Sequence, residues 1–296
     1  MLYQTHNPLQ LAFNFYCNRI DATEHQIIEG VERLRDTVKG IRKGYNKPIG
    51  KNFPYGEESF QNGYLLAYFP YYIEPIYHVL KSANLPDDLF DKEGLKVGFF
   101  GGGPCPEALG LAAYLREKAP HLRSVAISIY DREMSWKAVQ QGLLPQMLPH
   151  YAAKKTDYII QDRKCDITTC NFAKCKHSSS ITGTDLIIAQ NFLAEVQGDC
   201  NKAIDTFEGI IRRSNCRYAV FVENNYNENK NLMAVLSRRL VSKGFSTKVA
   251  NVTFKEIRPN FALPKVLQNH LFTGESGLMA KRNVKFHSMV IEIERQ

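Results

Sequence analysis

The residues best suited to bind a ligand are three consecutive glycines and one acid: Gly101, Gly102, Gly103 and Asp131. The glycines follow an apolar run at 97–100 that is typical of a buried parallel strand. Glycine lets the backbone approach a ligand closely, and the helix expected next offers unpaired N–H groups. Asp131 follows a second apolar run, where an acid can accept both hydroxyls of a ribose. The pattern favours a nucleoside-type ligand over a tight turn that binds nothing.

Three cysteines and a histidine crowd into thirteen residues, at Cys165, Cys170, Cys175 and His177. Thiolate and imidazole are ligands of zinc, and thiolates also hold iron–sulfur clusters. The cysteines are spaced more widely than in the usual C-x2-C arrangement. Two interpretations stay open: a zinc or iron–sulfur site on the three cysteines, or ordinary reduced cysteines in a loop. Cys105 or Cys200 adds a ligand only if the fold brings it near.

The stretch Gly101-Gly102-Gly103-Pro104 resembles the G-x-G-P turn of class I S-adenosylmethionine (SAM) dependent methyltransferases, and Asp131 resembles their ribose-binding acid. Two positions depart from the family pattern. Phe99 stands where an acid is usual, and Cys105 stands where a third glycine is common. A dehydrogenase is less well supported, because Pro106 occupies the third glycine position of G-x-G-x-x-G.

The resemblance implies further cofactor contacts. Asp166 and Ile167 follow the expected third strand, where the family places an acid and an apolar residue against the adenine. Asp162 is a rival for the acid. Gln190, at the end of the expected fourth strand, is a further cofactor contact, and Asn191 stands where the acceptor atom often lies or caps a helix. The N-P-P-Y type signature of amino-group methyltransferases is absent. No catalytic residue is identified.

Seven apolar or alternating segments can form the sheet that positions these residues: 97–100, 124–129, 158–160, 184–193 (the fourth strand and the segment after it), 218–222, 245–257 and 284–293. The last two are expected to pair antiparallel at one edge. The expected fold is α/β, a seven-stranded, mostly parallel Rossmann-like sheet with an antiparallel last strand. Residues 143–156, which contain Pro145 and Pro149, are expected to be irregular.

Residues 1–90 are expected to form an N-terminal helical region, and residues 91–296 a SAM-binding, methyltransferase-like domain. Within the first part, Tyr64, Tyr68 and Tyr72 recur every four residues. Such a stripe on one helix face can stack nucleic-acid bases, and more often it packs in a core. The segment 64–70 ahead of the glycine turn also resembles methyltransferase-like proteins associated with the small ribosomal subunit.

The chain has 296 residues and a net charge of +8, which favours an acidic partner such as RNA or a ribosomal component. Its seven cysteines are an odd number, which favours reduced thiols in a cytoplasmic location over a disulfide framework. No secretory signal is evident near the N-terminus. The most apolar stretch, 64–80, contains two prolines and a glutamate, so no membrane contact is expected. Nothing in the sequence indicates an oligomeric state.

Three functions follow from this pattern. The first is a SAM-dependent methyltransferase with an unknown acceptor, for which RNA or a ribosome-associated molecule is the candidate. Because the sulfonium of SAM is already activated, such an enzyme mainly aligns the acceptor and excludes water, and needs no obvious catalytic constellation. The second is a non-catalytic RNA- or ribosome-binding protein that retains the fold. The third is a SAM-using enzyme that transfers another group, such as aminopropyl.

Overall fold

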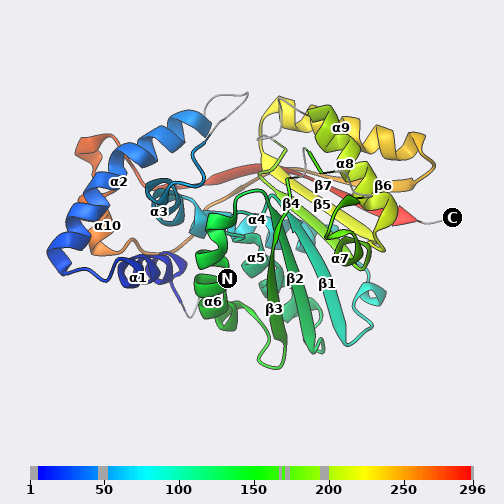
Figure 1. Cartoon of the computed structure of the whole chain (residues 1–296), viewed down its shortest axis with the longest axis horizontal. Helices are drawn as coiled ribbons and strands as arrows, with labels where there is room; N and C mark the ends of the chain where they lie inside the picture. Colours follow the sequence, from blue (N-terminus) through cyan, green and yellow to red (C-terminus); the bar gives the residue numbers. More distant parts are fainter. Residues whose placement is uncertain (1–5, 46–52, 167–168, 171–173, 194–199, 295–296) are drawn as a thin grey trace.

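The computed structural model describes residues 6–45, 53–166, 169–170, 174–193 and 200–294. Its strands are β1 (Gly94–Phe100), β2 (Ser124–Asp131), β3 (Asp157–Lys164), β4 (Leu186–Gln190), β5 (Tyr218–Asn224), β6 (Ser246–Ile257) and β7 (Val284–Glu294). They form one sheet in the order β3-β2-β1-β4-β5-β7-β6 (Figure 1). Strands β1 to β5 are parallel, and β7 is antiparallel to both β5 and β6. The expected Rossmann-like sheet is confirmed.

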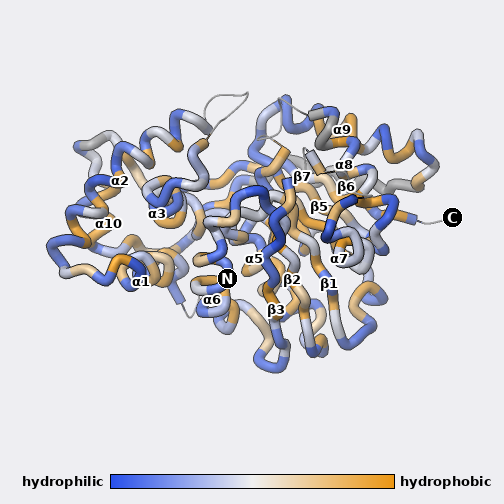
Figure 2. Tube along the Cα trace, in the orientation of Figure 1, coloured by the Kyte–Doolittle hydropathy of each residue, from blue (hydrophilic) through white to orange (hydrophobic). Residues whose placement is uncertain are grey.

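The central strands are buried on both faces, because helices cover the sheet on both sides. Every residue of β4 is buried, whereas the edge strand β3 alternates exposed and half-buried residues. A continuous apolar run is the expected signature of such a doubly covered strand. Figure 2 shows this contrast as hydrophobic segments on the central strands and hydrophilic segments on many outer turns.

The two faces of the sheet carry separate apolar cores. One core lies under α4 (Glu74–Ala83), α5 (Glu107–Lys118) and α6 (Leu144–Tyr151), and the other lies under α7 (Ser178–Thr182), α8 (Cys200–Arg213) and α9 (Asn227–Ser242). Successive residues of β1 supply both, since Phe99 belongs to the first core and Phe100 to the second. The result is a three-layer α/β/α arrangement (Figure 1).

Three N-terminal helices lie beside the sheet: α1 (Pro8–Ile20), α2 (Glu24–Tyr45) and α3 (Glu58–Ala67) (Figure 1). They share the first core with α4 to α6. Helix α10 (Lys265–His270), between β6 and β7, packs against α2, where Arg35 Nε donates to the His270 carbonyl at 2.5 Å. Arg42 Nη2 similarly donates to the Met279 carbonyl at 2.7 Å. The expected division at residue 90 stays a prediction.

The expectation that residues 143–156 are irregular is wrong, because helix α6 occupies much of this range. Pro145 lies in the first turn, where a helix does not use the missing N–H. Pro149 lies close to the helix end and removes only one donor. Short helical turns complete the fold: η1 (Phe69–Tyr72), η2 (Asp87–Leu89), η3 (Met134–Trp136), the π-helix η4 (Val139–Leu143) and η7 (Gly274–Ser276).

Among the helices of the described residues, none combines the length and the apolar character needed to cross a membrane.

Candidate functional site

The three glycines form the turn between β1 and α5. Gly101 and Gly103 have φ angles of +65° and +48°, which favour glycine. A Cβ atom on Gly101 would also overlap the ring of Phe192. Cys105 has a φ of +57°, an uncommon angle for a residue with a side chain. The backbone therefore keeps a glycine-like conformation at the position where the family often has a third glycine.

Asp131, the last residue of β2, lies against this turn. Its Oδ2 accepts a hydrogen bond from the Gly103 N–H at 2.7 Å, and its Oδ1 accepts one from the Glu133 N–H at 2.7 Å. Burial raises the pKa of the Asp131 carboxyl, and these two hydrogen bonds oppose the rise. Each carboxylate oxygen can accept a further hydrogen bond, so both remain suitable partners for the hydroxyls of a ribose.

Six of the seven predicted cofactor residues line one pocket at the carboxyl ends of β1 to β4: Gly101, Gly102, Gly103, Asp131, Asp166 and Gln190. We call it the glycine-turn pocket. Ile167 lies outside the described residues. The rival Asp162 does not line the pocket, since its carboxylate binds Gln141 and Lys137. The binding role of the six residues stays a prediction.

Gln190 offers an acceptor to a ligand in this pocket. Its Nε2 donates to the Tyr72 carbonyl at 2.8 Å. Its Oε1 is buried and meets no hydrogen-bond donor among the described residues. A buried carbonyl oxygen without a donor is costly, so a ligand N–H or O–H at this place would stabilise the protein. Asn191 follows with a φ of +56°, an angle that asparagine tolerates better than most residues.

Aromatic side chains form part of the pocket wall. Trp136 is only 2% exposed, and its ring meets Tyr64 edge-on at 5.7 Å between centroids. Trp136 is therefore both packed in the core and a boundary of the pocket. Tyr64, Tyr68 and Tyr72 are all buried and stack in series at 5.4 and 6.3 Å. The three rings stay stacked although α3 ends at Ala67, between the first and the second of them. The interpretation that this stripe packs in the core is confirmed.

Glu107 is a pocket residue that the sequence reasoning missed. It lies in the first turn of α5, lines the pocket and is only 2% exposed. Burial, with a smaller contribution from the neighbouring Asp131 charge, raises the pKa of its carboxyl to about 8. Glu107 is therefore predominantly protonated at neutral pH. Its place just after Pro106, at the helix start, was the only available signal.

We expect Glu107 to weaken the fold as the pH rises. The unfolded chain releases this proton near pH 4.5 and the folded chain near pH 8, so stability falls between these values. Glu107→Gln cannot ionise. Its free energy of unfolding, relative to the wild type, should rise by about 2 kcal/mol between pH 6 and pH 9. Urea unfolding at both pH values measures this. If the difference in unfolding free energy between Glu107→Gln and the wild type does not change with pH, the prediction is contradicted. Glu93→Gln, at an exposed position, is the control.

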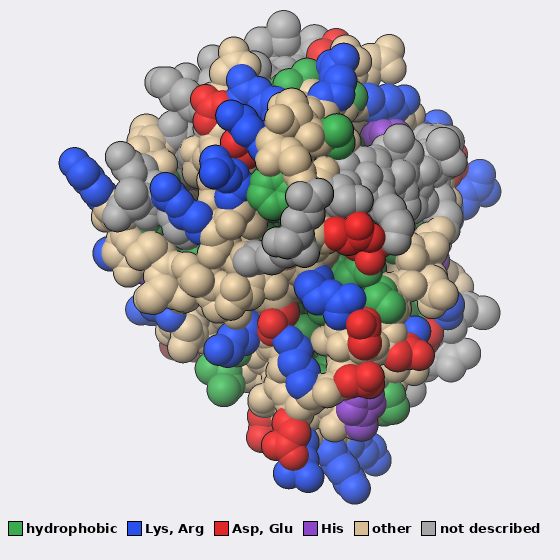
Figure 3. Space-filling view, turned by 90° about the vertical axis from the view of Figure 1, so that its right-hand side faces the viewer, with side chains coloured by type: hydrophobic (Ala, Val, Ile, Leu, Met, Phe, Trp, Pro, Cys, Tyr) green, Lys and Arg blue, Asp and Glu red, His purple; other side chains and the backbone are tan. Residues whose placement is uncertain are grey.

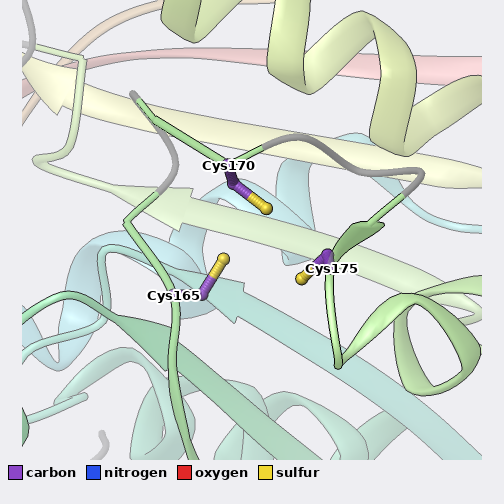
Figure 4. A group of neighbouring side chains, drawn as sticks. All are labelled: Cys165, Cys170 and Cys175. Atoms are coloured by element: carbon purple, nitrogen blue, oxygen red, sulfur yellow. The ribbon is translucent and has the colours of Figure 1, made fainter.

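The three predicted metal ligands converge next to the pocket. The sulfur atoms of Cys165, Cys170 and Cys175 all lie within 4.8 Å of one another and turn toward a common centre (Figure 4). Burial raises the pKa of the Cys170 thiol to about 11 and raises that of Cys165 as well. Cys165 also lines the glycine-turn pocket. Tetrahedral zinc would hold thiolate sulfurs about 3.8 Å apart, so the group fits a metal after a small contraction.

His177 is not part of this cysteine group. Its Nε2 lies 3.1 Å from the Lys164 carbonyl oxygen, and its ring packs edge-on against Tyr130. Cys105 is buried at the glycine turn and does not belong to the group either. The side chain of Cys200 lies outside the described part of the chain.

No family model and no curated protein matches this chain. Among solved structures, the chain is similar to a putative class I S-adenosylmethionine-dependent methyltransferase from Listeria monocytogenes, at 11% identity over 97% of this chain and 88% of that one, with a TM-score of 0.43. It is also similar to the methyltransferase domain of METTL16, at 12% identity over 76% and 69% of the two chains, with a TM-score of 0.41. At this distance, neither likeness carries an argument about activity.

Proposed function

We propose that this chain is a SAM-dependent methyltransferase whose cofactor binds in the glycine-turn pocket. One observation carries the proposal: the Asp131 carboxylate lies 2.7 Å from the Gly103 amide and faces the same pocket as Asp166 and Gln190. A carboxylate and a glycine turn at the carboxyl ends of parallel strands suit a nucleoside. The absence of a side chain on Gly101 lets the ring of Phe192 pack directly against the turn.

In this proposal the pocket residues bind and orient the cofactor and do not transfer protons. Bound SAM supplies a methyl group on a sulfonium, whose sulfur keeps the bonding electron pair when the methyl moves to a lone pair of the acceptor. Asp131 would accept hydrogen bonds from the ribose hydroxyls, and Asp166 would accept one from the adenine amino group. Gln190 Oε1 would accept a donor of the ligand. Trp136 and Tyr64 exclude water from one side of the pocket.

Titration with S-adenosylhomocysteine tests this proposal. Isothermal calorimetry should show one site per chain at micromolar to sub-millimolar concentration, and a co-crystal should place the ribose beside Asp131. No heat at millimolar ligand would contradict the cofactor assignment. Incubation with methyl-labelled SAM and cellular RNA or protein fractions then identifies the acceptor. Transfer of label favours the methyltransferase over the non-catalytic alternative, and the product mass separates methyl from aminopropyl transfer.

RNA or a ribosomal component remains our proposed partner, supported by the net charge of +8. On the face drawn in Figure 3, Lys and Arg are interspersed with Asp and Glu, so this face presents mixed charge. Filter binding of total RNA over a salt series tests the proposal, and affinity that falls steeply with salt supports it. A cytoplasmic location stays a prediction; among the described side chains, the cysteines form no disulfide.

We further propose that Cys165, Cys170 and Cys175 bind a metal, either zinc or an iron–sulfur cluster. Their thiolates would supply three ligands, and a bound metal would fix the backbone around Asp166 at the edge of the glycine-turn pocket. The metal's task there is structural.

Protein purified under exclusion of oxygen should contain about one zinc, or one cluster, per chain by elemental analysis and native mass. Cys170→Ser should lose most of that metal. Cys17→Ser, a half-buried thiol on α1, should keep it. Removal of the metal should weaken S-adenosylhomocysteine binding, because Cys165 lines the pocket. If the wild-type protein contains no metal and takes up neither zinc nor an iron–sulfur cluster when these are supplied, the three cysteines are ordinary reduced thiols.

A further inference from the structure

A second pocket lies next to the glycine-turn pocket, and Tyr45 lines both. We call it the tyrosine pocket, after six of its residues: Arg42, Tyr45, Tyr68, Tyr72, Tyr226 and Lys281. They come from α2, from the region around η1, from just beyond β5 and from the segment before β7. Tyr226 Oη donates to the Tyr45 carbonyl at 2.9 Å, which joins two of these walls.

Lys281 is a cation in this pocket without a counter-charge. Its Nζ donates to Tyr72 Oη at 3.1 Å and lies 4.7 Å and 5.4 Å from the ring centroids of Tyr72 and Tyr68. No Asp or Glu lines the pocket, and in the described part of the chain Lys281 forms no ion pair. Burial, followed by the nearby charge of Arg42, lowers the pKa of Lys281 to about 8. At pH 7 the amine is therefore predominantly charged.

Lys281 is half-buried, and its contacts only partly offset the cost of removing its ammonium from water. Two tyrosine rings stabilise the cation through their π faces. A neutral hydroxyl accepts one hydrogen bond, although an ammonium can donate three. Arg42 and Arg282 line the same pocket and add positive charge instead of removing it. A bound anion would supply what is missing.

We propose that the tyrosine pocket binds an oxyanion, a phosphate or a carboxylate, of the molecule that accepts the methyl group. The proposal rests on the function proposed for the glycine-turn pocket. Lys281 and Arg42 pair with the oxyanion, and the hydroxyl of Tyr72 remains within reach of it. A cationic acceptor is disfavoured here, because it would meet positive charges with no acid nearby.

The position of the tyrosine pocket suits an acceptor site. The carbonyl of Tyr72 binds Gln190 at the end of β4, and Gln190 also lines the glycine-turn pocket. The hydroxyl of Tyr72 lies 3.5 Å from Asn224 Oδ1 at the end of β5. An acceptor anchored by its oxyanion at Lys281 would extend past Tyr45 toward the cofactor. The pocket thus fixes the end of the acceptor that does not react.

Three small probes test the proposal on the full chain saturated with S-adenosylhomocysteine at pH 7. Phenyl phosphate and benzoate present the two oxyanions on the same ring, and benzamide is their neutral counterpart. Binding is measured by calorimetry at constant ionic strength. The wild type should bind at least one anionic probe roughly tenfold or more tightly than benzamide. Whichever anion binds more tightly identifies the oxyanion of the acceptor.

The variants decide whether Lys281 is responsible. Lys281→Met should lose the preference for the anion, and Lys281→Arg should retain most of it. Lys155→Met removes an exposed lysine near β3 and should behave as the wild type. An unchanged anion affinity in Lys281→Met, or no preference in the wild type, would overturn the proposal. Titration of each variant with S-adenosylhomocysteine reports folding and keeps a failure here distinct from a failure of the cofactor assignment.

Discussion

Replacement of Asp131 by alanine is expected to weaken the binding of S-adenosylhomocysteine by about two orders of magnitude. The carboxylate is the acceptor we assign to both ribose hydroxyls, and a hydrogen bond to a charged group contributes about 1.5–3 kcal/mol. A loss of about 3 kcal/mol corresponds to roughly a hundredfold in affinity. The substitution also releases the Gly103 and Glu133 N–H groups, which Asp131 holds at 2.7 Å each. Calorimetric titration measures the change.

Asp162→Ala is the matched control for this experiment. Asp162 lies on β3 and binds Gln141 and Lys137 instead of lining the pocket. Its loss should leave the affinity within about twofold of the wild type. Asp131→Asn keeps the shape of the side chain and can still accept from one hydroxyl, so an intermediate affinity is expected. Equal affinities of Asp131→Ala and wild type would remove Asp131 from the cofactor site.

Phe207→Ala should be among the most destabilising single changes, at about 3–5 kcal/mol. Phe207, on α8, is fully buried and meets Phe100, Phe192 and Phe221 at centroid distances of 5.8, 5.7 and 5.2 Å. Its loss leaves a cavity and removes three edge-on ring contacts at once. The free energy of unfolding in urea at neutral pH measures the effect.

Phe207→Ala should also weaken ligand binding in the glycine-turn pocket. Phe192 packs against Phe207 and fills the space next to Gly101, so its ring gains freedom when Phe207 is lost. Cofactor affinity should therefore fall by a few-fold even in the folded fraction. Phe245→Ala, at a half-buried position of the same core, is the control and should cost about 1 kcal/mol. Equal losses at the two positions would contradict the prediction.

The sheet was predictable because its signals are local. Residues 97–100 and 218–222 are continuous apolar runs, as parallel strands between two layers of helices require. The cysteine group was visible for the same reason, since Cys165 and Cys175 are only ten positions apart. Helix α6 was not predictable in the same way, because proline usually breaks a helix, whereas Pro145 lies in the first turn and Pro149 close to the end.

The remaining site residues depend on contacts between distant parts of the chain. Glu107 looks like any acid at a helix start until packing buries it beside Asp131. The contact of Lys281 with Tyr72 joins residues 209 positions apart, and no local pattern encodes it. A stripe of tyrosines in the sequence likewise gives no sign that a lysine will cover two of its rings. Such pairs become visible only when the fold is known.

The hydrogen bonds from α2 to His270 and Met279 have a consequence for biosynthesis. The helix leaves the translating ribosome more than two hundred residues before its partners do. Its apolar residues Val31, Leu34 and Val38 belong to a core that also contains Leu267 of α10, so this core is complete only after α10 has been made. Contacts between residues so far apart in the sequence slow folding and prolong the exposure of apolar surface. A nascent chain stalled before residue 260 should therefore engage chaperones longer than the finished protein does.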